Sequence, residues 1–214
     1  MDIQLINKLI TFEGIDGSGK STQIQLLNNW FDSNKIKINN IREPGGNNIS
    51  EVIREVLLDR DNKINSFSET LLFLASRAQL VDETILPLLA KDEFVICDRF
   101  IDSTVVYQGY GRGLDIKKLE EINHIATAGL TPDITFILDI NPEVASARMA
   151  AESPDRMEAT GMEFFRRIQN GYCQIKDQNP NRCRVINGEQ SPENVFKEIK
   201  EILMERFEEV LTCS

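Results

Sequence analysis

The chain has 214 residues, of which 41% are hydrophobic and 27% are charged, a composition typical of a globular protein and unlike that of a disordered one. Its 34 acidic and 24 basic side chains give a net charge of -10, which disfavours binding to the phosphate backbone of nucleic acids. The four cysteines show no CxxC spacing and the only histidine is His124, so no zinc site is expected.

The first residues lead directly to a strand, without a basic region followed by an apolar one, and no apolar run approaches the length of a membrane span. We therefore expect one domain over residues 1–214, no membrane segment, free thiols and a cytoplasmic location.

Short apolar runs rich in β-branched residues recur along the chain and predict strands. Because most of these runs are largely apolar, we expect both faces of each strand to be buried. The runs are residues 9–12, 36–41, 94–97, 134–138 and 184–186.

Amphipathic segments separate the strands and predict helices. The clearest segment has apolar residues spaced alternately by four and three, which predicts a core helix with these residues on its buried face: Phe67, Leu71, Leu74, Ala78, Val81, Ile85 and Leu88. Asp115 is expected to cap a helix that ends at Gly129, and Asn141 to cap one that has Pro142 at its first position. The alternation predicts a mostly parallel sheet with helices on both sides.

Residues 148–156 break the pattern, because polar residues and Pro154 interrupt two helical segments. We expect a short mobile lid here.

Residues 14–21 match GxxxxGK[ST] and lie between a strand and a helix carrying Ile24, Leu27 and Phe31. In such a P-loop, backbone N–H groups and the positive end of the helix dipole surround phosphates. Lys20 is expected between the β- and γ-phosphates, and the Ser21 hydroxyl on Mg²⁺. The residues expected to bind ATP are Gly14, Ile15, Asp16, Gly17, Ser18, Gly19, Lys20, Ser21 and Thr22.

A GTPase is disfavoured because the sequence contains no NKxD motif, which GTPases use to recognise guanine.

The strand at residues 94–97 is followed by Asp98 and Arg99, at the edge of an α/β sheet where ligands bind. Asp98 is suited to holding Mg²⁺ through water, and the planar fork of Arg99 to a phosphate oxygen pair. The alternative is an Asp98–Arg99 ion-pair network at the strand end.

Four motifs occur in order: Phe12-Glu13-Gly14-Ile15-Asp16-Gly17, Arg42-Glu43-Pro44-Gly45-Gly46, Asp98-Arg99-Phe100 and Tyr107-Gln108-Gly109-Tyr110-Gly111-Arg112-Gly113. Together they resemble the thymidylate kinase family over essentially the whole chain. The resemblance implies transfer of the γ-phosphate of ATP to dTMP with Mg²⁺, giving dTDP, the step before dTTP in DNA precursor synthesis. It also implies a three-layer α/β nucleoside-monophosphate-kinase-like fold, with a five-stranded parallel sheet, a short lid and a homodimeric assembly.

The resemblance also assigns roles in dTMP binding. It places Phe73 against the thymine ring and Arg77 on the base, which agrees with their spacing of four on one helical face. Arg99 would grip the acceptor phosphate, Tyr107 would close the sugar side and exclude a ribose 2′-OH, and Ser103, Thr104 and Gln108 would lie near the base edge. Glu43, beside Pro44, is expected to orient Arg99 or a metal-bound water, or else to belong only to a turn. Asp16 is assigned to the sugar or the metal, with loop rigidity as the alternative.

A cationic side chain is needed to neutralise the phosphoryl group during transfer. One branch of the family carries an Arg in the P-loop where this chain has Gly17, and the other branch carries basic residues in the lid. The lid here has Ala150, Ala151 and Glu152, and offers only Arg148, which we favour, and Arg156. The expected catalytic set is Lys20, Arg99, Arg148, Arg156 and Asp16.

Two rival functions remain at this point. The chain could phosphorylate another monophosphate or a nucleoside, or it could be an inactive P-loop protein that binds nucleotide to order a partner surface.

Overall fold

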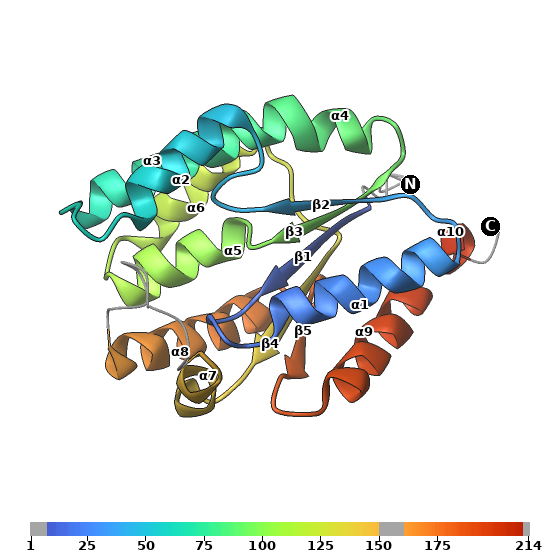
Figure 1. Cartoon of the computed structure of the whole chain (residues 1–214). Helices are drawn as coiled ribbons and strands as arrows, with labels where there is room; N and C mark the ends of the chain where they lie inside the picture. The colour runs from blue at the N-terminus through green and yellow to red at the C-terminus, as the bar shows by residue number, and fades with distance from the viewer. Residues whose placement is uncertain (1–7, 150–160, 212–214) are drawn as a thin grey trace.

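The structure is a computed structural model that describes residues 8–149 and 161–211. Its centre is a five-stranded parallel sheet with the order β2-β3-β1-β4-β5 (Figure 1). This confirms the predicted fold class. In chain order the elements are β1 (Leu9–Glu13), α1 (Lys20–Ser33), β2 (Ile38–Arg42), α2 (Asn48–Leu58), α3 (Ser66–Leu80), the π-helical turn η1 (Val81–Ile85), α4 (Leu86–Leu89), β3 (Phe94–Asp98), α5 (Ile101–Thr104), the π-helical segment η2 (Val105–Gly111), α6 (Ile116–Ala126), β4 (Ile134–Asp139), α7 (Pro142–Arg148), α8 (Met162–Gln178), β5 (Cys183–Asn187), α9 (Pro192–Arg206) and α10 (Glu208–Leu211).

Successive side chains of each inner strand point to opposite sides of the sheet. Both faces of the sheet are therefore apolar, and helices cover both of them. Ile10 and Phe12 pack against Leu27 of α1 on one face, together with apolar residues of α9. Leu9, on the other face, packs with Leu80 at the end of α3. A third cluster joins η2 and α8 on this second face. The three layers leave the carboxyl ends of the strands as the open edge of the sheet.

The expectation that every strand is buried on both faces is wrong for the two edge strands. β1, β3 and β4 are buried almost throughout, whereas much of β2 and β5 is half-buried or exposed. Each edge strand has a neighbour on one side only. Asn39 and Asn40 occupy the outer edge, where polar side chains are tolerated.

The predicted core helix is present as the continuous α3, η1 and α4, but only its second half is buried. Leu74, Val81 and Ile85 are buried, whereas Phe67 is 59% and Leu71 49% exposed. The first half of α3 extends past the sheet and packs beside α2 instead (Figure 1). The sheet therefore does not cover Phe67 and Leu71.

The predicted helix starts are confirmed. The Asp115 side chain accepts from the N–H of Lys118 at 3.2 Å and that of Asn141 accepts from the N–H of Glu143 at 2.8 Å. The predicted end at Gly129 is wrong, because α6 ends at Ala126. Gly129, with φ at 79°, closes the turn that follows.

The segment predicted as a lid follows α7, which ends at Arg148, and precedes α8, which begins at Met162. Residues 150–160, including Arg156, lie outside the described residues. Over the described ranges, no helix combines the length and the apolar character needed to cross a membrane.

Candidate active site

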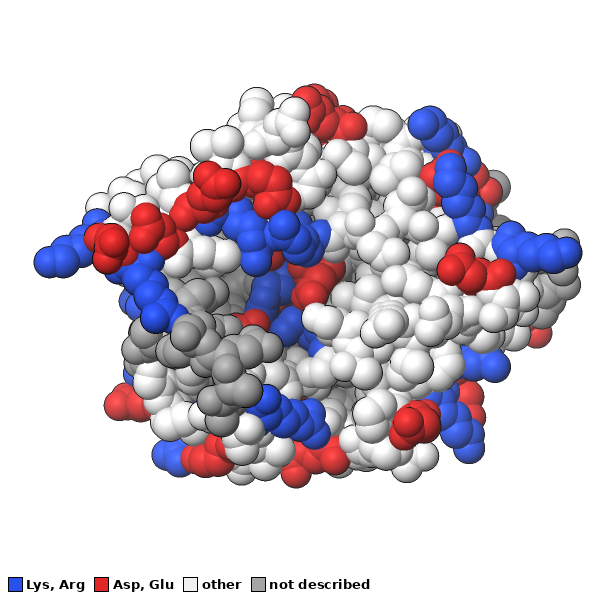
Figure 2. Space-filling model, in the orientation of Figure 1, with Lys and Arg blue, Asp and Glu red and all other residues white. Residues whose placement is uncertain are grey.

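Two adjacent cavities open at the carboxyl ends of the strands. The inner cavity is lined by Asp16, Glu43, Pro44, Arg54, Leu58, Phe73, Arg77, Arg99, Ser103, Thr104, Tyr107 and Gln108. The P-loop cavity is lined chiefly by residues 16–23, together with side chains such as Asp98, Arg99 and Arg148. Figure 2 shows a hollow on this side of the molecule, where Lys and Arg side chains gather beside acidic ones.

The P-loop follows β1 and curls around the start of α1. Its glycines are needed for its shape: at Gly17, with φ at 77°, an added Cβ would lie 2.6 Å from the carbonyl oxygen of Ala145 in α7. The buried Lys20 ammonium donates to the carbonyl oxygens of Gly14 and Ile15, at 3.1 Å each. Burial, and next the nearby Arg99, lower the pKa of Lys20. The loop thus holds a cation against its own backbone, in the position expected for phosphate binding.

Arg99 begins the turn after β3 in a strained backbone conformation, with φ at 70°. Its N–H donates to the carbonyl of Phe12 at 2.9 Å, and its guanidinium donates to Asp16 at 2.6 Å and to the carbonyl of Gly14 at 3.0 Å. The ion-pair partner of Arg99 is therefore Asp16 rather than Asp98. Burial alone would raise the pKa of Asp16, but Arg99 and then Lys20 outweigh it and hold that pKa below its usual range.

Glu13, the last residue of β1, holds the turn that follows β3 through hydrogen bonds to its backbone and side chains. One carboxylate oxygen accepts from the N–H groups of Phe100 and Ser103 at 2.8 and 3.2 Å. The other accepts from the hydroxyls of Ser103 and Tyr172 at 2.6 and 2.9 Å. Burial, followed by repulsion from Asp102, raises the pKa of Glu13 to about 7.

Arg77 of α3 is almost completely buried, at 1% exposure, and each of its five N–H groups has an acceptor in the protein. Nε and one Nη donate to Glu43, and the remaining hydrogens go to Thr104, Asn123 and the carbonyl of Phe100. Burial raises the pKa of Glu43, and the charge of Arg77 opposes that rise.

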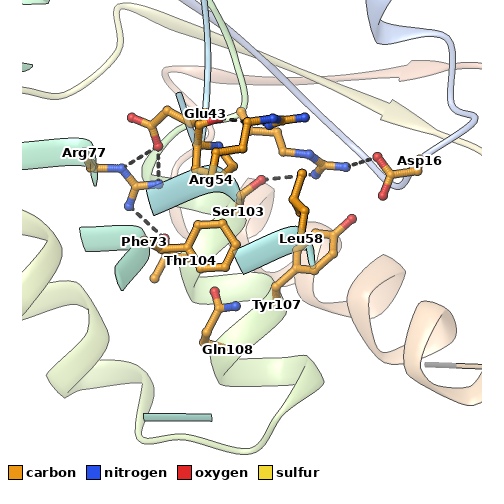
Figure 3. A pocket seen from close by; sticks show the side chains of 12 residues that line it. Asp16, Glu43, Arg54, Leu58, Phe73, Arg77, Ser103, Thr104, Tyr107 and Gln108 are labelled. Atoms are coloured by element: carbon orange, nitrogen blue, oxygen red, sulfur yellow. Dashed lines mark hydrogen bonds and ion pairs between the residues drawn. The ribbon is translucent and has the colours of Figure 1, made fainter. Parts of the chain in front are cut away.

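Of the roles expected for Glu43, a contact with Arg99 is not found among the described residues, because Oε2 accepts from Arg77 and Oε1 has no hydrogen-bond partner there. The turn after β2 brings Glu43 over α3, while Arg99 turns toward the P-loop and Asp16. Figure 3 shows Arg77 and Glu43 on one side of the inner cavity and Asp16, the partner of Arg99, on the other.

The side chains predicted to bind dTMP all line the inner cavity. Phe73 and Arg77 reach it from α3, and Ser103, Thr104, Tyr107 and Gln108 reach it from α5 and η2 (Figure 3). The guanidinium carbon of Arg99 lies 5.0 Å from the centre of the Tyr107 ring, in a cation–π contact. The aromatic rings and polar groups around one space suit a planar heterocycle with hydrogen-bonding edges.

Asp16, Glu43, Arg54 and Arg99 line both cavities, so the cavities meet at a group of charged side chains. Arg54 was not predicted. It lies on α2, and it donates to the carbonyl of Pro44 at 2.8 Å. The one usable signal in the sequence was that a helix starting just after the Arg42–Gly46 motif places its second turn near that motif.

Ser21 and Asp98, the predicted metal residues, both line the P-loop cavity. One buried carboxylate oxygen of Asp98 has no hydrogen-bond donor within the described part of the chain. Hydroxyl and carboxylate oxygens are the donors that Mg²⁺ prefers, so these residues fit it. The described residues contain no cluster of three or more His, Cys, Asp or Glu that could hold a metal by itself, and an ion here would need oxygens from phosphates.

Arg148 lies at the end of α7 and lines the P-loop cavity. Both of its terminal nitrogens lie 3.1 Å from the carbonyl oxygen of Gly188, and one lies 3.4 Å from that of Gly17. Gly188, Gln190 and Pro192 also line this cavity and were not predicted. Their position after the fifth strand, at the ligand-binding edge, was the signal that could have identified them.

Comparisons with known proteins agree with this arrangement. A family model described as Thymidylate kinase matches residues 12–199. A thymidylate kinase of Chlorobaculum tepidum is 48% identical over 201 residues, covering 89% of this chain and 94% of the relative. One of Kosmotoga olearia is 45% identical over 197 residues, covering 91% and 95%. The crystal structure of thymidylate kinase from Ehrlichia chaffeensis aligns with a TM-score of 0.76 at 36% identity, covering 92% of this chain and 97% of that one. The chain belongs to the thymidylate kinase family.

Proposed function

We propose that the chain transfers the γ-phosphoryl group of ATP to dTMP, giving ADP and dTDP, the precursor of dTTP. The observation that carries this proposal is the meeting of a P-loop cavity and an aromatic cavity at Asp16, Arg54 and Arg99. A donor and an acceptor bound in the two cavities would bring their phosphates together at these charges. Relatives named thymidylate kinases support dTMP as the acceptor.

On the donor side, the P-loop N–H groups and Lys20 hold the β- and γ-phosphates. Lys20 now donates to two loop carbonyls, so it is poised to exchange them for phosphate oxygens. Ser21 and Asp98 would hold Mg²⁺, which would neutralise negative charge on the phosphates of ATP.

On the acceptor side, Phe73 stacks on the base and Tyr107 closes the sugar side, excluding a ribose 2′-OH. Arg99 grips the acceptor phosphate, assisted by Arg54. Asp16 aligns Arg99 through the 2.6 Å ion pair. Because the acceptor phosphate is already anionic at neutral pH, its oxygen attacks without a strong general base, and the reaction depends on alignment and charge neutralisation.

Either Arg148 or Arg156 supplies the cation that neutralises the phosphoryl group in transit, and we favour Arg148. It lies beside Gly17 and Gly188 at the P-loop cavity, so it can reach a donor phosphate by leaving these carbonyls. Arg148→Met and Arg156→Met should be compared by kcat, because the residue that acts in transfer will lower kcat more than KM.

A coupled assay of ADP release with Mg-ATP and a panel of monophosphates tests the proposed function. We expect dTMP to be turned over far faster than dUMP, the ribose form of TMP, or AMP. Equal rates with AMP would refute the assignment of the acceptor, and no turnover with any acceptor would favour a nucleotide-binding role. Omission of Mg²⁺ should abolish turnover, with rescue by added Mg²⁺.

We further propose a homodimer that pairs through α2 and α3. Ile49, Val52 and Val56, spaced by three and four on α2, are 53%, 61% and 42% exposed, and α2 packs beside α3, which exposes Phe67 and Leu71. A patch of this kind favours association. Light scattering should report a dimer for the wild type and a monomer for Val52→Glu. A wild-type monomer at micromolar concentration would contradict this proposal.

We place the enzyme in the cytoplasm. Cys97, Cys173 and Cys183 are free thiols, as expected in a reducing compartment. Cell fractionation with an antibody to the chain tests the location.

A further inference from the structure

The side-chain amide of Gln108 has a fixed orientation in the inner cavity. Its nitrogen donates to Oε1 of Glu69 at 3.0 Å, and the residue is 2% exposed. Its amide oxygen has no hydrogen-bond donor among the described residues, and in Figure 3 it points toward the space beside Phe73 and Thr104. Within the described part of the chain, the cavity therefore contains a hydrogen-bond acceptor to which no protein group donates.

Glu69 explains why the amide takes this orientation. The residue is completely buried on the first turn of α3 and is ion-paired with Arg112, at 3.4 Å. An ionised carboxylate only accepts hydrogen bonds, so it can face the nitrogen of Gln108 but not its oxygen. Reversing the amide would bring the oxygen of Gln108 against the carboxylate of Glu69, which places two acceptors together in a buried place and is unfavourable.

Thr104 can offer a hydrogen-bond donor to the same cavity, where Gln108 offers an acceptor. Its hydroxyl oxygen accepts from Arg77 at 2.7 Å, so the hydroxyl hydrogen can be donated to a ligand. The cavity thus offers a donor at Thr104 and an acceptor at Gln108. A uracil- or thymine-type ring carries the matching carbonyl O4 and N3–H, whereas cytosine has a 4-amino group and an N3 without hydrogen.

We propose that Glu69 is a positioning residue for base selectivity: it holds the oxygen of Gln108 toward the base, so that the cavity accepts the N3–H of a thymine or uracil ring and rejects cytosine. This inference rests on the proposed function, because it assumes that the inner cavity holds a pyrimidine monophosphate.

The test is Glu69→Gln, with dUMP and dCMP as the compared acceptors. The new amide can offer either a donor or an acceptor, so the Gln108 amide is free to reverse and to present its nitrogen to cytosine. We expect the ratio of kcat/KM for dUMP over dCMP to fall about tenfold, since one good base contact discriminates by about that factor or more. Where dCMP turns over too slowly, its inhibition constant replaces kcat/KM. The dTMP to dUMP ratio should not change, because these bases differ only by a methyl group.

Glu163→Gln provides a matched control, since Glu163 is also paired with an arginine, Arg167, but on the exposed surface of α8. It should leave all ratios unchanged. Gln108→Met should lower turnover of dUMP while leaving dCMP nearly unaffected, and adding Glu69→Gln to it should have no further effect on the ratio. This second pair also tests the proposal if Glu69→Gln alone does not fold.

Three results would overturn the proposal: an unchanged dUMP to dCMP ratio in folded Glu69→Gln, an equal loss for all acceptors, or an unchanged ratio in Gln108→Met. If the wild type instead prefers no pyrimidine monophosphate, the proposed function itself fails. The two failures are therefore distinguishable in one set of assays.

Discussion

The inner cavity and the P-loop cavity are lined by different kinds of groups. In the inner cavity, buried side chains bind one another: Arg77 donates to Glu43 and Thr104, and Gln108 donates to Glu69. In the P-loop cavity, backbone groups of a glycine-rich loop form much of the wall, and Ser21 and Thr22 are exposed. Phosphates look alike in all nucleotides, and backbone N–H groups are enough to bind them, whereas a base has to be distinguished by placed side chains.

Because the two cavities are lined differently, we expect substitutions in them to differ in their effects on stability and on catalysis. Changes in the inner cavity leave buried polar groups without partners, so they should affect both folding and binding. Changes in the P-loop cavity should affect the reaction while the fold persists.

Lys20→Met should lower kcat about a thousandfold or more, since it removes a charge aimed at the transferred phosphoryl group. Its melting temperature and its affinity for dTMP should stay close to those of the wild type. Loss of ADP release in the coupled assay, together with calorimetric binding of dTMP, would support the separation. Residual turnover within tenfold of the wild type would show that Lys20 does not serve the reaction.

Arg77→Met should destabilise the protein by roughly 3–5 kcal/mol, because it leaves the Glu43 carboxylate buried without its ion-pair partner. Arg148→Met, in the other cavity, should change the free energy of unfolding by less than about 0.5 kcal/mol. Urea unfolding of both variants measures this contrast. Similar losses in the two variants would remove the distinction between the cavities.

Glu13, which holds the turn after β3, should give the protein a pH-dependent stability. Its pKa is raised from an ordinary 4.5 to about 7 in the folded protein, chiefly by burial. Between these pH values the folded chain holds a proton that the unfolded chain has released, so the free energy of unfolding falls as the pH rises through this window. This group contributes a fall of about 3 kcal/mol. Unfolding curves from pH 4.5 to 8 should show this fall in the wild type relative to Glu13→Gln, and parallel pH profiles would contradict it.

Much of the fold could be predicted because the order of strands and helices follows local patterns. The P-loop and the Asp98–Arg99 strand end were located from motifs whose chemistry requires that spacing. The burial of individual residues was harder to predict. The apolar spacing of α3 did not reveal that the helix extends past the sheet and exposes Phe67, nor did the residues around Asn39 reveal an edge strand.

Pairings between distant segments were the least predictable part of the site. Glu43 and Arg99 are each near a strand end, which suggested a contact, yet Arg77 takes the carboxylate and Asp16 takes Arg99. Such choices depend on the direction of each side chain after folding and not on sequence spacing. Arg54 was missed because its only signal was indirect: it lies on the second turn of a helix that starts just after the Arg42–Gly46 motif.

The close approach of Gly17 to α7 sets a limit on redesign. A side chain at position 17 would meet the carbonyl oxygen of Ala145 and would also force the loop out of its positive φ. An arginine cannot therefore be moved from the lid into the P-loop by a single substitution. Such an exchange would also need a shift of α7. A catalytic arginine could therefore come from the P-loop instead of the lid only if the loop and α7 changed together.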